Sequence, residues 1–249
     1  MRWLLIARSA PAGVAFLILL TLVSLNVAAA PAAGLRSLDA GAFFPAWSPD
    51  GQRIAFVRGR QVYVMRPDGR GQRALTSSRT QKSDPAWSPD GRKIAFLASR
   101  AAPFHDRGLY VVNADGTKEH LVSGFGHAYE SPTWSPGGRR IAFGAEPGIS
   151  MVGADGRGLK RLTATGYRPA WSPNGRKIAF EDVINPDDCQ SAIFVMNADG
   201  RKRLRLTTSG DGEEPAWSPD GRRIAFSSDL SYRGGDGSAI YVMYAARRN

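Results

Sequence analysis

Apolar and polar positions alternate along this chain in one short pattern that occurs five times. A Pro-Ala-Trp type segment leads into a Ser-Pro-Asp-Gly type turn, and a basic-Ile-Ala-Phe segment leads out of it. The copies are PAWSPDGQRIAF (45–56), PAWSPDGRKIAF (85–96), PTWSPGGRRIAF (132–143), PAWSPNGRKIAF (169–180) and PAWSPDGRRIAF (215–226). Proline presets the first turn position, Asp tolerates the next, and glycine supplies the positive φ that follows. Each copy therefore predicts a β-hairpin.

A second hairpin is predicted after the first in each repeat. Its leading strand is expected at 62–65, 109–112, 149–152, 193–196 and 240–243, and Asp-Gly turns follow at 68–69, 115–116, 155–156 and 199–200. The fourth strand is expected to end at 75–76, 121–122, 162–163 and 206–207. The repeat tryptophans are 40, 47, 37 and 46 residues apart. Four strands with a period near forty residues are typical of one blade of a β-propeller.

The fifth repeat stops after Met243, before a fourth strand. A short segment, Leu35–Leu38, precedes the first repeat, with its last leucine at a similar distance from the repeat proline, so we expect it to complete the last blade. Closure of this kind removes an exposed sheet edge. The predicted fold is an all-β propeller of five four-stranded blades over 35–244. The repeats are 45–76, 85–122, 132–163, 169–207 and 215–244 plus 35–38.

The first thirty residues have the features of a secretory signal peptide. A short basic start precedes the uncharged run 13–30, and small residues follow as a cleavage site requires. An uncleaved signal anchor is the alternative, because about 18 apolar residues can just span a bilayer. We expect a periplasmic or secreted protein with no membrane span after cleavage. Its single cysteine, Cys189, cannot form an internal disulfide.

The formal net charge is +11, and +9 without the leader. Export argues against nucleic acid as the partner. Anionic envelope polymers, lipid head groups or acidic proteins suit that compartment better. Much of the positive charge is expected beside the hairpin turns, either as solvated side chains or as a surface for anionic envelope components.

The phrase P-x-W-S-P-D-G-x-x-I-A-F, followed by I-F-V-M-N-A-D-G and R-L-T, resembles the propeller repeats of the TolB family over 35–244. The resemblance implies a non-enzymatic periplasmic scaffold that binds protein partners and helps to maintain the cell envelope. TolB proteins have six blades and an N-terminal α/β domain. The five copies and the lack of that domain make this chain similar to a stand-alone TolB-like propeller. Similar repeats occur in prolyl-oligopeptidase-type peptidases, but no hydrolase domain follows Asn249.

Function is expected at the mouth of the central channel, where the copies differ from one another just before the proline. The first strand of each blade is innermost, so these residues should line the mouth. The candidate partner-binding residues are Phe43, Phe44, Asp84, Glu130, Tyr167, Arg168, Glu213 and Glu214. A rim of solvated loop residues without a ligand is the alternative. Nearby loops are expected to add acids, among them Asp182.

No cofactor or metal is expected. Acids from several blades could hold Ca²⁺, but no loop has the D-x-D-x-D spacing with a closing Glu. His105 with Asp106, and His127 with Glu130, could bind a transition metal, although loop histidines are usually only polar.

The chain has no G-x-S-x-G, H-E-x-x-H or Walker motif. The leading prediction is therefore an exported, non-catalytic binding propeller. The alternative is a small hydrolase or lyase acting on a carbohydrate or lactone, with two or more of Asp84, Glu130, Glu213 and Asp229 converging. Glu213 and Glu214 are not expected to form a catalytic pair, because adjacent strand residues point to opposite faces.

Overall fold

The computed structural model describes residue 39 and residues 41–99, 107–124, 130–185, 190–207, 212–229 and 238–245. The chain divides into two units, Met1–Ser37 and Leu38–Asn249, and all described residues belong to the second. The predicted leader, 1–30, and the predicted closing strand, 35–38, lie outside the described residues. So do His105, Asp106, His127 and Cys189.

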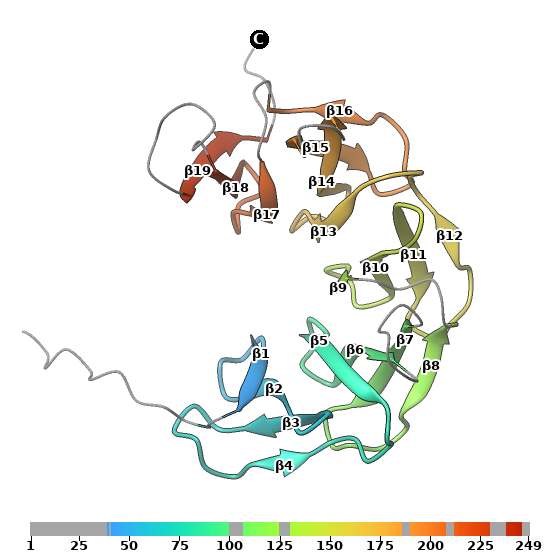
Figure 1. Ribbon diagram of the computed structural model, residues 1–249, viewed down its shortest axis with the longest axis vertical. Coiled ribbons are helices and arrows are strands. Elements are labelled where there is room, and N and C mark those ends of the chain that lie inside the picture. Colours follow the sequence, from blue (N-terminus) through green and yellow to red (C-terminus); the bar gives the residue numbers. More distant parts are fainter. Residues whose placement is uncertain are drawn as a thin grey trace, which may run out of the picture. The chain divides into compact units, whose positions relative to one another are not determined.

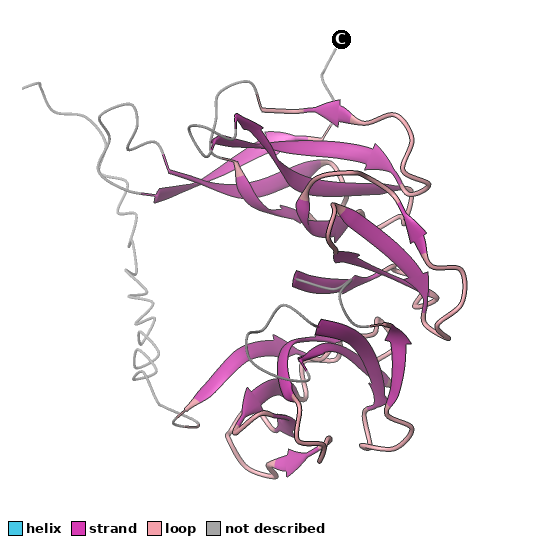
Figure 2. Cartoon of the chain, turned by 45° about the vertical axis from the view of Figure 1, so that its right-hand side comes forward, coloured by secondary structure: helices cyan, strands magenta, loops and turns pink. Residues whose placement is uncertain are grey.

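The described residues form strands joined by turns and loops (Figures 1 and 2), and no helix among them is long and apolar enough to cross a membrane. They build five antiparallel sheets that follow one another in chain order. The first four sheets have four strands each, as predicted. The first sheet is β1 (Ala42–Trp47), β2 (Ile54–Arg58), β3 (Gln61–Met65) and β4 (Arg73–Ala74); the second is β5 (Gln81–Trp87), β6 (Lys93–Ser99), β7 (Arg107–Asn113) and β8 (His120–Ser123).

The remaining sheets repeat this order. The third sheet is β9 (Glu130–Trp134), β10 (Arg140–Gly144), β11 (Ile149–Gly153) and β12 (Lys160–Arg161); the fourth is β13 (Tyr167–Trp171), β14 (Lys177–Asn185), β15 (Gln190–Asn197) and β16 (Leu204–Arg205). The fifth has three strands within the described residues, β17 (Glu213–Trp217), β18 (Arg223–Asp229) and β19 (Ser238–Tyr244). The outermost strands β4, β8, β12 and β16 are shorter than the rest, with two to four residues, and all but β8 end before the predicted leucine.

The Ser-Pro-Asp-Gly turns have the conformation that their residues predict. In the first, the Gly51 amide donates to the Ser48 carbonyl at 2.9 Å, and Gly51 has a φ of +68°. Ser48 Oγ donates to the Asp50 carboxylate at 2.5 Å and accepts from the Arg53 amide at 2.8 Å. Side chains within the repeated sequence thus hydrogen-bond to the backbone of their own hairpin. The turn does not depend on distant residues, so the same sequence can form it in every repeat.

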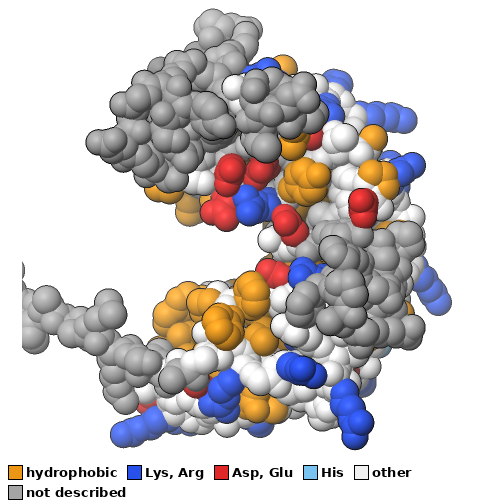
Figure 3. Space-filling view, viewed as in Figure 1, with side chains coloured by type: hydrophobic (Ala, Val, Ile, Leu, Met, Phe, Trp, Pro, Cys, Tyr) orange, Lys and Arg blue, Asp and Glu red, His pale blue; other side chains and the backbone are white. Residues whose placement is uncertain are grey.

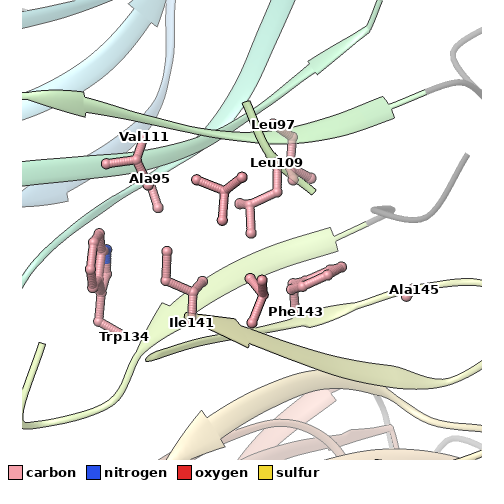
Figure 4. Close-up of a cluster of buried hydrophobic side chains, with 10 residues drawn as sticks. Ala95, Leu97, Leu109, Val111, Trp134, Ile141, Phe143 and Ala145 are labelled. Atoms are coloured by element: carbon pink, nitrogen blue, oxygen red, sulfur yellow. The ribbon is translucent and has the colours of Figure 1, made fainter. Parts of the chain in front are cut away.

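The core lies between consecutive sheets rather than inside any one of them. Figure 4 shows one such layer, in which side chains of the second sheet such as Leu97 and Leu109 face Trp134, Ile141 and Phe143 of the third. The repeat tryptophan also ties three of the sheets to the one before them. Its indole N–H donates to the preceding sheet's alanine carbonyl, Trp87 to Ala46, Trp134 to Ala86 and Trp217 to Ala170, at 3.1, 3.0 and 3.1 Å. The buried indole N–H of Trp171 has no hydrogen-bond partner among the described residues. First strands of neighbouring sheets contact one another throughout, β1 with β5, β5 with β9, β9 with β13 and β13 with β17.

The hairpin turns of all five sheets form one continuous surface, which we call the turn face. From the second sheet onward, each turn glycine lies against the proline of the preceding turn, as Gly91 does against Pro49 and Gly138 against Pro89. Basic residues predicted beside the turns are therefore brought together on this face. They include Arg53, Arg66, Arg70, Arg73, Arg92, Lys93, Arg139, Arg140, Arg157, Lys160, Arg176, Lys177, Arg201, Lys202, Arg222 and Arg223.

Candidate functional site

Five residues, one before the proline of each repeat, share an unusual backbone conformation. Phe44, Asp84, Ser131, Arg168 and Glu214 have φ values of +55°, +53°, +42°, +48° and +52°. A break in strand register accompanies each of them. The left-handed region costs an L-residue about 1–2 kcal/mol. Among the described residues the chain uses glycine at fifteen other positive-φ positions, but at none of these five.

The first three sheets form an apolar half of the mouth. Phe44 and Asp84 line a cavity of about 240 Å³ together with Ser131 and the prolines Pro45, Pro85 and Pro132. Phe43 and Phe44 are 63% and 48% exposed. Figure 3 shows apolar side chains gathered over the first sheet. The mouth therefore offers unpaired aromatic surface beside a shallow hollow.

The last three sheets form a charged half centred on Arg168. Its guanidinium lies 3.1 Å from Glu181, 3.3 Å from Glu213, 3.8 Å from Glu130 and 3.9 Å from Glu214. These carboxylates come from β9, β14 and β17, so the cluster joins three sheets. With every group ionised, four carboxylates surround one cation, and the cluster is negative overall. Acidic and basic side chains meet in this way at the inner edge of the fourth and fifth sheets (Figure 3).

The expectation that Glu213 and Glu214 point to opposite faces is wrong. Both carboxylates reach the same guanidinium of Arg168. The reason is the register break between Glu213 and Ala216, together with the positive φ of Glu214, which interrupts the alternation of an ordinary strand.

Glu181 is the site residue that sequence reasoning missed. It lies in β14 opposite Tyr167 and is only 9% exposed. Its signal was present in the repeats, because the residue after Ile-Ala-Phe is Val57, Leu97, Gly144, Glu181 and Ser227 in the five copies. At this position the other copies have an apolar residue, a glycine or a serine. Packing of the core does not require a carboxylate there, so the glutamate indicates another role.

Burial raises the pKa of Glu181, and the nearby Glu213 raises it further, although Arg168 acts in the opposite direction. For Arg168 itself, burial works against the charged form. The carboxylates of Glu181, Glu130 and Glu214 outweigh that effect and raise its pKa. Arg168 therefore stays positively charged, whereas Glu181 beside it loses its proton at a higher pH than an ordinary glutamate.

Other predicted residues have different surroundings. Tyr167 is 43% exposed and stands at the edge of the charged half. Asp182, expected in a loop of this face, is instead a buried residue of β14, paired with Arg203 and accepting from Thr165 Oγ1 at 2.8 Å. Asp229 ends β18, and its side chain lies outside the described part of the chain. No three His, Cys, Asp or Glu side chains within the described ranges are arranged to hold a metal.

Replacing Glu181 with glutamine should stabilise the protein at neutral pH. The folded state binds the Glu181 proton more tightly than the unfolded state, so stability is lost as pH rises from the ordinary value of 4.5 through the raised folded pKa. Glutamine has no carboxyl group to ionise, so the variant does not lose this stability as the pH rises. We expect a higher urea midpoint for Glu181→Gln at pH 7, and a gap between the two proteins that closes below pH 4.5.

The exposed Glu119, replaced by glutamine, is the control for losing one negative charge. Urea titrations from pH 3.5 to pH 8 measure both variants. A Glu181→Gln protein less stable than the wild type at pH 7, and equal to it at low pH, would mean that the ion pair with Arg168 outweighs burial.

A model of the TolB beta propeller domain matches residues 24–182, well over half of the chain. The chain belongs to the TolB β-propeller family. Its five repeated sheets are thus propeller blades, and the predicted family is confirmed. A search of curated proteins gave no match.

Solved structures agree with this fold. The putative TolB from Agrobacterium tumefaciens has a TM-score of 0.65 and 21% identity, covering 82% of this chain and 77% of that one. TolB from Acinetobacter baumannii has a TM-score of 0.63 and 20% identity, covering 84% and 53%, so this TolB-family chain spans about half of that protein. An oligogalacturonate lyase in complex with manganese has a TM-score of 0.67 and 13% identity, covering 82% and 62%. At these identities the likeness concerns the fold alone.

Proposed function

We propose that this TolB-family propeller is an exported, non-catalytic binding protein that engages a protein or cell-envelope partner at the mouth. The observation that carries the proposal is the left-handed backbone of the five residues before the repeat prolines. Glycine would relieve that strain, and the chain uses it freely elsewhere. Arg60, Lys118 and Lys202 are also non-glycine residues with positive φ, but among the described residues only the position before the repeat proline has this conformation without glycine in all five repeats. Strain that is retained in every copy of a repeat is typical of positions whose side chains serve function.

The two halves of the mouth indicate the chemistry of the partner. Exposed Phe43 and Phe44 favour an apolar or aromatic group, and the cavity of about 240 Å³ beside them can receive it. The excess of carboxylates around Arg168 favours a positive group. A polypeptide segment that carries an apolar side chain near a basic one fits both halves.

The charged half brings together Glu130 and Glu213, two of the four acids named for the hydrolase or lyase alternative, since both lie on Arg168 at 3.8 and 3.3 Å. We nevertheless favour binding over catalysis, because of where the guanidinium lies. A glycosidase-type mechanism needs open space between two carboxyl groups for the scissile bond or a water molecule. Glu181 and Glu213 are both bound to Nη1 of Arg168, at 3.1 and 3.3 Å, so a guanidinium occupies that position. Asp84 lies in the other half of the mouth, beside the prolines.

Replacing Phe44 with glycine should remove binding without harming the fold. Glycine accepts a φ of +55°, so the free energy of unfolding should stay within about 1 kcal/mol of the wild-type value. Capture of the partner from a cell-envelope extract should fall about tenfold, because an aromatic anchor is lost. Quantitative pull-down at low and at physiological salt, with mass spectrometry of the captured proteins, measures this.

Lys202→Gly is the matched control. Lys202 has the same backbone conformation, with a φ of +56°, but it is exposed on the turn face away from the mouth. It should keep full capture. If both variants capture the same proteins as the wild type, or if the wild type captures none at either salt concentration, the mouth is not the binding site.

A further inference from the structure

The turn face has a groove at the junction of the first and second sheets. Two adjoining cavities of about 590 Å³ each share Arg53 and Arg73 in their walls. Arg66 lines one of them, and Arg92 and Lys93 line the other. We call this the arginine groove. It is separate from the mouth, because it lies among the hairpin turns.

Neutral partners hold both shared arginines in place. Arg53 donates to the carbonyl of Gly91 at 3.0 Å, and its guanidinium stacks on Trp87 at 4.5 Å from the ring centre. Arg73 donates to the carbonyls of Asp115 and Ala114 at 2.6 and 3.0 Å. A guanidinium has five N–H donors, so each arginine keeps donors for a ligand. Carbonyl partners orient the two cations, and neither makes a salt bridge with another described residue, although hydrogen bonds lower the pKa of Asp50 with help from Arg53, and the pKa of Asp115 with help from Arg73.

The acids in the groove are engaged within their own turns. Asp68 accepts from the Arg70 amide at 2.9 Å. Asp115 accepts from the amide and the hydroxyl of Thr117 at 2.9 and 2.6 Å. Five cationic side chains therefore face two carboxylates that are already hydrogen-bonded, and the groove favours an anion.

The pair of arginines distinguishes this junction from the others. Strand register places His120, Lys160 and Leu204 where the first sheet has Arg73. The residue before the repeat isoleucine, Arg53 in the first sheet, is Lys93, Arg140 and Lys177 in the next three. Among the described residues only the first junction combines two arginines. Paired guanidiniums bind the oxygens of a phosphate more specifically than lysines do.

We propose that the arginine groove binds a phosphate group, with Arg53 and Arg73 as its direct ligands and Arg66, Arg92 and Lys93 supplying further positive charge. The two cavities that share these arginines leave room for the group that carries the phosphate, as in a phosphodiester. Such a group can come from a lipid head group or from a soluble phosphate, and both present the same oxygens.

The test uses the full chain and two probes. Binding of inorganic phosphate is measured by calorimetric titration. Binding to lipid is measured by co-sedimentation with phosphatidylcholine vesicles that contain about 30% anionic phosphatidylglycerol, and vesicles of pure phosphatidylcholine are the reference. The double variant Arg53→Gln/Arg73→Gln should weaken binding about tenfold or more. Arg73→Lys keeps the charge and should still weaken it, because a lysine cannot bind in a bidentate manner.

The matched control is Arg157→Gln/Arg176→Gln, which removes the same charge from the turn face outside the groove. It should change binding less than about twofold, since distant exposed charges are screened. Loss of both probes in the groove variant identifies a phosphate site that includes lipid head groups. Loss of inorganic phosphate alone, with no vesicle binding by the wild type, identifies a site for soluble phosphate. Equal weakening in groove and control variants, or no binding of either probe by the wild type, would overturn the proposal.

Discussion

Replacing Trp134 with alanine should lower the free energy of unfolding by about 4 kcal/mol, whereas the same change at Trp47 should lower it by less than about 1 kcal/mol. Trp134 is 7% exposed and fills the layer between the second and third sheets (Figure 4). Its indole N–H also donates to Ala86 at 3.0 Å, so alanine leaves both a cavity and an unpaired carbonyl. Urea denaturation followed by circular dichroism measures both variants.

Trp47 is the matched control because it occupies the same place in the same phrase. It lies in the first sheet, and within the part of the chain that the structure describes no hydrogen bond joins its indole to another sheet, while its side chain is 59% exposed. A loss at Trp47 as large as the loss at Trp134 would contradict the expected difference. It would mean that another element covers Trp47, as the predicted closure of the ring by the fifth blade requires.

Replacing Gly148 with alanine should lower the free energy of unfolding by about 3–5 kcal/mol. An added Cβ would lie 2.4 Å from the Thr163 carbonyl oxygen, 2.7 Å from the Thr165 nitrogen and 2.8 Å from the Ala164 carbonyl carbon. These are backbone atoms, and Thr163 is held to Ile149 by hydrogen bonds of 2.9 and 3.3 Å. The clash therefore adds to the left-handed strain of a φ of +82°.

Gly158→Ala separates strain from clash. Gly158 has a φ of +66°, but nothing lies within 4 Å of an added Cβ, so this variant should lose only about 1–2 kcal/mol. Thermal unfolding and soluble yield measure both proteins. Equal losses at the two positions would show that the segment 163–165 moves aside and that the close approach does not constrain Gly148.

Several features of the fold could be predicted because they depend on neighbours in the sequence. The turn at Ser48–Gly51 follows from proline, a short acid and glycine in succession, and the side chains that satisfy it lie within five residues. The leading strands of the second hairpins are present where the apolar segments indicated, as in β3 and β15. Repetition of these local choices also identified the family.

The site was only partly predictable for a related reason. Phe44, Arg168 and Glu214 were found because the copies disagree there, but their left-handed backbone arises where two strands lose register. The expectation of ordinary alternation therefore failed at Glu213 and Glu214. Glu181 was missed because it belongs to a strand that otherwise reads as core.

The repeat, its hairpins, the family and the positions at which the five copies differ all follow from the order of the residues. Turn chemistry and strand periodicity act over a few residues, so they can be read from the order of the residues alone. Only the tertiary structure decided that Arg168 gathers four carboxylates from three sheets, and that Arg53 and Arg73 share one groove. These residues are between 13 and 46 positions apart in the sequence. The contacts form because apolar side chains, among them tryptophan and leucine, pack between successive sheets and hold them next to one another.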